Sequence, residues 1–226
     1  MKSILPYILA LFAGSVIFIG LPLLGWGPGS IPQFFDHPAR LAYVVVILAL
    51  QIFSLIYNPQ VGRNQEQRKS GVKQSKTDLI LIQIFSLTVV ILAPFSDGHS
   101  SGVLNIGDAV RYAGIILCVP GFILMQMAEK YLGRQFSVEV TLQEGHKLIQ
   151  DGPYKFIRHP RYLGILLFFT GISLAFRSLF SILVVLALGI VLVWRVFAEE
   201  ALMKQEFGKD WDAYCAGSWR ILPFLF

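Results

Sequence analysis

The sequence predicts an all-α integral membrane protein with about six transmembrane helices, and three observations support this fold class. Hydrophobic side chains make up 55% of the 226 residues and charged ones only 15%, whereas a soluble domain carries about 25% charged residues. The mean hydropathy is +0.63. The apolar residues gather in six blocks between polar or turn-forming segments, and about 20 helical residues span the hydrocarbon core of a bilayer.

The six predicted spans are residues 4–24, 41–57, 78–95, 109–128, 162–176 and 179–197. The first block could be a signal peptide, but Pro22, Trp26 and Pro28 follow it in place of a small-residue cleavage site, so we interpret it as a span. The fourth block contains Pro120-Gly121, which predicts either a kink or a widened cavity.

The fifth block is short for a crossing, because 15 helical residues rise only about 22 Å. It forms a hairpin with the sixth block, and we expect its Gly164, Gly171 and Ser173 to pack closely against that partner. Residues 198–217 place apolar side chains along one side of a helix. They predict a separate C-terminal amphipathic helix at the inner interface.

The distribution of cations predicts the topology. Sixteen of the 19 Lys and Arg residues fall in loops 58–77 and 129–161 and at the two termini, which leaves Arg40, Arg111 and Arg177 for the other side. The positive-inside rule therefore places both termini and both loops in the cytoplasm. The net charge of +5 belongs to these loops, so we expect membrane lipids as partners and no nucleic acid.

Residues 144–164, EGHKLIQDGPYKFIRHPRYLG, form a polar segment between two apolar blocks. Proline pushes its predecessor out of the α region, so the sequence predicts an extended His159 and a helix that starts at Pro160. A helix N-terminus with nearby cations binds anionic ligand groups. The alternative interpretation is a positively charged loop that only sets topology.

Two ionisable residues lie at the end of the sixth span. Arg195 and Glu199 are four residues apart and share one helix face, at a depth where charges are costly unless they face a cavity or a partner. A simple intrahelical ion pair is the alternative. The two cysteines form no paired motif, and His146, His159 and Cys215 lack metal-ligand spacing, so we expect no metal.

The run GHKLIQDGPYKFIRHPRYLG, followed by Glu199-Glu200-Ala201-Leu202 and Glu206-Phe207-Gly208, resembles the signature of the isoprenylcysteine carboxyl methyltransferase family. That superfamily of integral membrane enzymes also includes the phospholipid N-methyltransferases. The resemblance covers residues 132–223 and divides the chain into N-terminal helices, 1–128, and a signature region, 129–226, with a cytoplasmic cofactor-binding loop.

The resemblance implies transfer of a methyl group from S-adenosyl-L-methionine, with S-adenosyl-L-homocysteine as product, to a lipidic or small hydrophobic acceptor. It implies carboxyl O-methylation, with phospholipid N-methylation or small-thiol S-methylation as alternatives. Glu199 would be a catalytic residue toward the cofactor, and Arg195 a catalytic residue that binds the acceptor. The implied cofactor contacts are His146, Lys147, Leu148, Ile149, Tyr154, Arg158, His159, Pro160, Arg161, Tyr162, Glu199 and Glu200.

Three comparisons separate this interpretation from others. A soluble methyltransferase would show a Gly-rich turn after a strand, and the sequence has none. A non-catalytic transporter or scaffold would place polar residues near mid-membrane, where Gln51 and Gln83 are almost alone. A sterol-reductase-like enzyme that uses NADPH shares related C-terminal motifs, but such enzymes are considerably longer.

Overall fold

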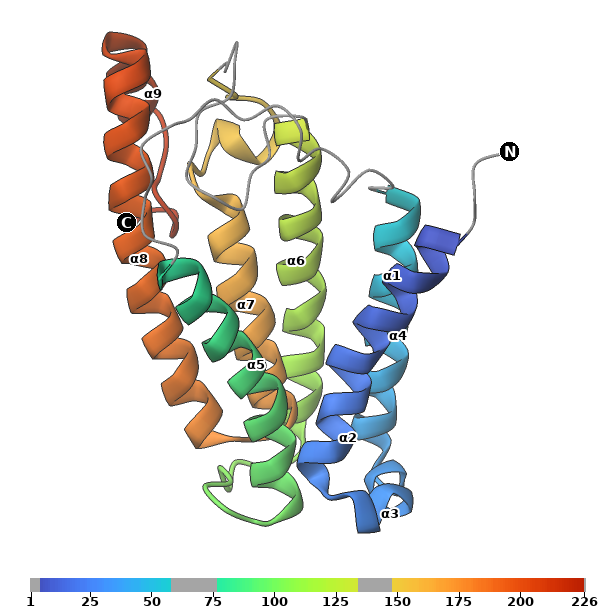
Figure 1. Cartoon of the computed structure of the whole chain (residues 1–226). Helices are drawn as coiled ribbons and strands as arrows, with labels where there is room; N and C mark the ends of the chain where they lie inside the picture. The colour runs from blue at the N-terminus through green and yellow to red at the C-terminus, as the bar shows by residue number, and fades with distance from the viewer. Residues whose placement is uncertain (1–4, 58–76, 134–147, 226) are drawn as a thin grey trace.

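The computed structural model describes residues 5–57, 77–133 and 148–225, which form a bundle of helices that run broadly along one direction (Figure 1). Between these residues there are isolated β-bridges but no strand. The α-helices are α1 (Leu5–Ser15), α2 (Leu21–Trp26), α3 (Ile31–Phe35), α4 (Pro38–Tyr57), α5 (Thr77–Gly98), α6 (Ala109–Leu132), α7 (Pro160–Ala175), α8 (Leu179–Phe207) and α9 (Lys209–Ala216). Short helical turns are Val16–Gly20, Pro28–Ser30 and Gly152–Lys155.

The apolar helices occupy the six stretches that the sequence predicts as spans. Within the described residues, five runs are long and apolar enough to cross a membrane: Leu5–Trp26, Pro38–Tyr57, Thr77–Gly98, Ala109–Leu132 and Leu179–Phe207. The predicted shortness of the fifth block is also found, because α7 has 16 residues and rises about 24 Å. The chain is an all-α integral membrane protein.

Helix α7 lies at the centre of the bundle, where 11 of its 16 residues are buried and α5, α6 and α8 surround it (Figure 1). Its glycines meet α6, because a Cβ added at Gly171 would lie 2.6 Å from the carbonyl oxygen of Gly114, and one added at Gly164 would lie 2.7 Å from that of Gly121. The expected packing of these glycines against the hairpin partner α8 is therefore wrong. Sequence adjacency gave the hairpin, but the small residues mark the backbone contact with α6.

The predicted boundary between the last span and a separate amphipathic helix 198–217 is also wrong. Helix α8 continues without a break to Phe207, and only the short α9 follows. Residues 198–207 contain no proline or glycine, so nothing stops the helix there. Gly208 ends it with a φ of 52°, a conformation that favours glycine.

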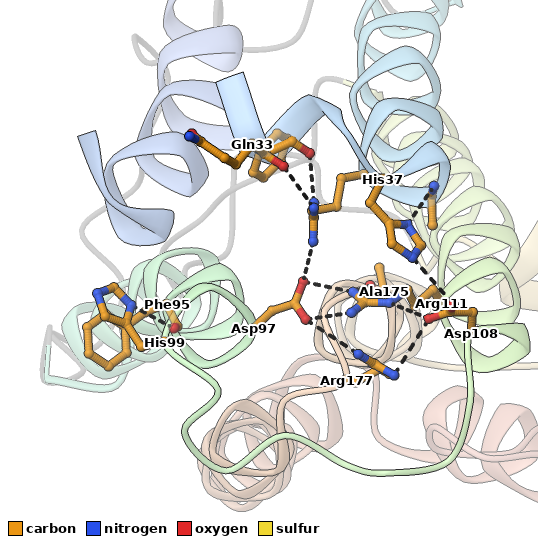
Figure 2. A network of polar contacts seen from close by, with 12 residues as sticks. Gln33, His37, Phe95, Asp97, His99, Asp108, Arg111, Ala175 and Arg177 are labelled. Carbon is orange, nitrogen blue, oxygen red and sulfur yellow. Dashed lines mark hydrogen bonds and ion pairs between the residues drawn. The ribbon is translucent and has the colours of Figure 1, made fainter. Parts of the chain in front are cut away.

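A charged network closes the end of the bundle where α5 ends and α6 begins (Figure 2). It unites Arg40, Arg111 and Arg177, the three cations that the topology prediction assigns to the outer side. Their guanidinium groups surround one buried carboxylate, with Arg111 Nη2 2.5 Å, Arg40 Nη1 3.4 Å and Arg177 Nη2 3.9 Å from oxygens of Asp97. Arg111 also donates to the carbonyl of Ala175, at 3.1 Å. The network thereby ties the ends of α4, α5, α6 and α7 together.

Candidate functional site

The opposite end of the bundle holds the candidate site, which begins at the start of α7. Pro160 is the first residue of the helix, so the predicted helix start is confirmed. His159 has φ −123° and ψ 58°, which lies outside the α region but is not extended, so the predicted extended conformation is wrong. The carbonyl oxygen of His159 accepts the first backbone bonds, from Tyr162 at 3.1 Å and Leu163 at 3.3 Å. The imidazole therefore stands at a helix N-terminus, as the sequence predicts.

The His159 imidazole lies between two carboxylates of α8. Its Nδ1 is 3.5 Å from Glu199 Oε2, and its Nε2 is 3.5 Å from Glu200 Oε1. The second contact has an ion-pair distance but not hydrogen-bond geometry, so Nε2 is a buried nitrogen without a hydrogen-bond partner among the described residues. Burial lowers the pKa of this histidine, but the two carboxylates outweigh burial and the net pKa is raised. The site thus favours an imidazolium.

Arg195 and Glu199 form the ion pair that their spacing predicts, and the signature helix α7 completes it. Arg195 Nε donates to Glu199 Oε1 at 2.9 Å and to the Tyr162 hydroxyl at 2.7 Å. The same hydroxyl donates to Glu199 Oε1 at 2.5 Å. Only 4% of Arg195 and 6% of Tyr162 is exposed. The pair is therefore part of a buried network between α7 and α8 and not an isolated intrahelical contact.

Sequence reasoning missed one member of this network, Asp78 in the first turn of α5. Its Oδ2 lies 2.5 Å from Nη1 of Arg195 across a separation of 117 residues. Asp78 is 8% exposed. The available signal was a carboxylate at the start of an apolar span, where an ionisable group is costly without a partner; its partner could not be read from spacing.

Glu200 joins the site to the C-terminal tail. Its Oε1 accepts from Arg158 Nε and its Oε2 from Arg220 Nε, both at 2.9 Å. Arg158 Nη1 also donates to the carbonyl oxygens of Cys215, at 3.2 Å, and Ser218. Both guanidinium groups therefore connect Glu200 to the tail, since Arg158 binds the carboxylate and tail carbonyls and Arg220 belongs to the tail.

Backbone bonds strengthen this attachment of the tail. The amide of Arg158 donates to the Trp219 carbonyl at 2.7 Å, and that of His159 donates to the Arg220 carbonyl at 2.9 Å. Trp219 in turn donates to the Phe156 carbonyl at 2.9 Å. The tail is thus fixed beside the signature segment, which the sequence does not reveal.

The remaining predicted site residues have different surroundings. The Tyr154 hydroxyl donates to the Ala128 carbonyl of α6 at 3.3 Å, and burial raises the pKa of this phenol. Arg161 Nε pairs with Glu129 Oε1 at 3.0 Å, which links α7 to α6. Leu148 and Ile149 are half-buried. His146 and Lys147 lie outside the described residues, so their predicted contacts stay predictions.

Comparison with known proteins places this bundle among related chains. A model of the phospholipid methyltransferase family matches residues 109–210. The probable protein-S-isoprenylcysteine O-methyltransferase of Oryza sativa subsp. indica is 31% identical over 123 residues, which cover 51% of this chain and 62% of the rice protein. The Delta(14)-sterol reductase of Ascobolus immersus is 32% identical over 90 residues, 38% of this chain but only 21% of that enzyme.

A solved structure extends the similarity to the whole fold. The eukaryotic intramembrane Ras methyltransferase ICMT (isoprenylcysteine carboxyl methyltransferase) superposes with a TM-score of 0.59, at 17% identity, over 100% of this chain and 88% of that one. The helical fold of this chain is therefore similar to that of this intramembrane protein. The resemblance to the isoprenylcysteine carboxyl methyltransferase family is confirmed by the family model and by the rice relative, and the solved structure shares the fold.

Proposed function

We propose that this protein is an S-adenosylmethionine-dependent membrane methyltransferase that acts on a hydrophobic or lipidic acceptor. The observation that carries the proposal is the single buried network in which Arg195 and Glu199 of α8 meet Tyr162 and His159 of the signature segment. Those four residue types are the ones that the family resemblance assigns to cofactor and acceptor. The rice relative, which is by name a probable protein-S-isoprenylcysteine O-methyltransferase, supports the same chemistry.

The donor set fits the proposed cofactor. S-adenosylmethionine carries an ammonium, a carboxylate and a sulfonium, which supplies an activated methyl group when the cofactor is bound. Glu199 offers a carboxylate to a cationic group, and the buried His159 Nε2, without a hydrogen-bond partner among the described residues, suits an anionic or accepting group. Leu148 and Ile149 lie half-buried at the edge of the same segment. We assign these residues to cofactor binding. Tyr162 contributes indirectly, because its hydroxyl binds the Glu199 carboxylate.

The chain's task in such a reaction is positioning, because methyl transfer from a sulfonium needs little acid-base chemistry. Arg195 is 4% exposed, so a carboxylate held there by a charge-assisted contact is shielded from water and kept in near-attack geometry. Trp194 and Ile190 of the same helix are 60% and 73% exposed on an apolar face. A hydrocarbon chain in the lipid would lie against these side chains.

The structure also supports a second candidate, N-methylation of a phospholipid amine. Arg195 is flanked by two carboxylates, Asp78 and Glu199, so the group of three does not carry a net positive charge. An ammonium acceptor tolerates this arrangement, and a carboxylate would remove its proton before methyl transfer. The matching family description, phospholipid methyltransferase, points the same way.

One experiment tests the function and separates the two acceptors. Purified protein would be incubated with radiolabelled S-adenosylmethionine and either S-farnesylcysteine with a free carboxylate or phosphatidylethanolamine. Base-labile label on the cysteine supports carboxyl methylation, and base-stable label on the lipid supports N-methylation. Calorimetry with S-adenosylhomocysteine measures cofactor-site binding alone. No label on either probe rejects both acceptors, and the further absence of binding heat overturns the proposal.

We further propose that the end of the bundle with Glu199 and the C-terminal tail faces the cytoplasm, as the cation count predicts. Ala213 of α9 and Ser101 of the loop between α5 and α6 are both exposed. Helix α9 and the end of α5 lie at opposite ends of the bundle (Figure 1). In a background without Cys118 and Cys215, an impermeant thiol reagent applied to intact cells should label Ser101→Cys and spare Ala213→Cys. The reverse pattern would invert the proposed topology.

A further inference from the structure

We propose that Asp78 is a positioning residue for Arg195, so that α5 supplies a third side to the site formed by α7 and α8. This inference rests on the proposed function, in which Arg195 contacts the methyl acceptor. Nothing in the signature segment points to Asp78, since it lies outside residues 109–210 that match the family.

The argument starts from how the Arg195 guanidinium is held. Glu199 and Tyr162 bind Nε, at 2.9 and 2.7 Å, and Glu199 belongs to the same helix as Arg195. A contact at Nε does not by itself set the orientation of the two Nη nitrogens. Asp78 binds Nη1 at 2.5 Å from another helix. Contacts at two separate nitrogens fix the plane in space, and this is the property that orientation of an acceptor requires.

Two simpler explanations of Asp78 account for less of the structure. An acidic residue in a first helical turn interacts favourably with the helix dipole, but Asp78 is buried and directed to a guanidinium that is itself 4% exposed. A tie that merely holds α5 to α8 does not account for the partner, because Asp78 contacts the same guanidinium that Glu199 and Tyr162 bind. At the opposite end, the hydroxyl of Ser178, which caps α8, already bonds to that of Ser96 of α5 at 2.9 Å.

If Asp78 acts through Arg195, its loss should affect the acceptor and spare the cofactor. Asp78→Ala should lower kcat/KM for the acceptor about tenfold or more, which corresponds to the loss of one charge-assisted contact. The dissociation constant of S-adenosylhomocysteine should change by less than about threefold, because Glu199 and His159 keep their other partners. Asp78→Glu, which keeps the carboxylate, should recover at least part of the acceptor kcat/KM.

A double-mutant cycle gives the decisive comparison. In an Arg195→Ala background, Asp78→Ala should have no further effect on kcat/KM with the acceptor that the wild type methylates. The exposed acid Asp212, which pairs with Lys204 on the surface, provides the control Asp212→Asn, with the wild-type kcat/KM expected. Equal loss of S-adenosylhomocysteine binding and turnover in Asp78→Ala, or a multiplicative loss in the double variant, would overturn the inference.

Thermal unfolding keeps this test independent of activity. The Tm reductions of Asp78→Ala and Arg195→Ala should be less than additive in the double variant, because the second change removes a contact already lost. Additive reductions would show that the pair does not form, whatever the protein catalyses. The wild-type protein could also fail to bind S-adenosylhomocysteine and to methylate either probe while the variants show non-additive Tm reductions. That result would reject the proposed function and the positioning role, and the pairing of Asp78 with Arg195 would stand.

Discussion

The charged network where α5 ends and α6 begins makes a quantitative prediction about stability, because its contacts are unequal. Asp97 is the shared partner of three guanidinium groups, and its side chain is 3% exposed. Asp97→Asn removes the charge that compensates all of them. Breaking a buried ion pair in this way costs about 3–5 kcal/mol. For a chain of this size about 1 kcal/mol lowers Tm by roughly 2–4 °C, so we expect a reduction of about 6–20 °C.

Arg177→Met should reduce the free energy of unfolding far less than Asp97→Asn. This guanidinium lies 3.9 Å from Asp97 and 3.6 Å from Asp108, and its side chain is 21% exposed. Pairs of this kind contribute about 0–1 kcal/mol, which corresponds to a Tm reduction of no more than about 4 °C. The structure therefore predicts a much larger reduction in Tm for Asp97→Asn than for Arg177→Met.

Cys118 provides the assay, because its thiol is buried against the α7 backbone and 1% exposed. In a Cys215→Ser background in detergent, a thiol-reactive dye should label Cys118 only as the bundle unfolds. S-adenosylhomocysteine binding by the folded Asp97→Asn variant should stay as in wild type, since the candidate site lies at the opposite end. Equal Tm reductions in Asp97→Asn and Arg177→Met, or a larger one in Arg177→Met, would refute this account of the network.

Three further predictions follow from the core and the site. Gly171→Ala places a Cβ 2.6 Å from α6 atoms and should cost about 1–3 kcal/mol, whereas Gly189→Ala, with 3.6 Å to its nearest neighbour, should leave Tm nearly unchanged in the same dye assay. The two carboxylates raise the pKa of His159, so the stability from these contacts is complete below the unfolded pKa of about 6.5. It is lost as pH rises through the folded pKa. Tm should fall over that pH range, and His159→Asn should remove this dependence of Tm on pH. Glu199→Gln should weaken S-adenosylhomocysteine binding about tenfold or more, while Arg195→Ala should spare it and depress turnover, as calorimetry and methyl transfer would measure; a silent Glu199→Gln with binding lost in Arg195→Ala would reverse the assignment.

The helices could be predicted because apolar length and proline position act locally. The start of α7 at Pro160 and the apolar span of α8 follow from residues within one or two turns. The predicted boundary after Phe197 is wrong because it rests on the amphipathic pattern that follows, whereas the first residue able to stop the helix is Gly208. Amphipathicity sets which face is buried, and it does not end a helix.

Contacts between distant helices could not be predicted in the same way. A glycine such as Gly171 shows that some backbone approaches closely, but its spacing does not say which one. Sequence reasoning singled out Arg195 but not Asp78, and their pairing needs the arrangement of α5 beside α8. Within the candidate site, the residues of α7 and α8 could therefore be predicted from the sequence, while the Asp78 side chain of α5 required the structure.

The energetics of burial decide between a structural ion pair and a functional network at Arg195. An intrahelical pair needs only two residues, yet Arg195 is bound from three helices, by Glu199, Tyr162 and Asp78. Apolar residues of similar volume in place of a buried ionic group are often neutral or stabilising, so stability alone does not require charges in this place. Ionisable groups within the membrane are costly in free energy, and a place where several of them converge is a candidate functional site. The convergence of three helices on one buried guanidinium therefore favours a group that is held in place to meet a ligand.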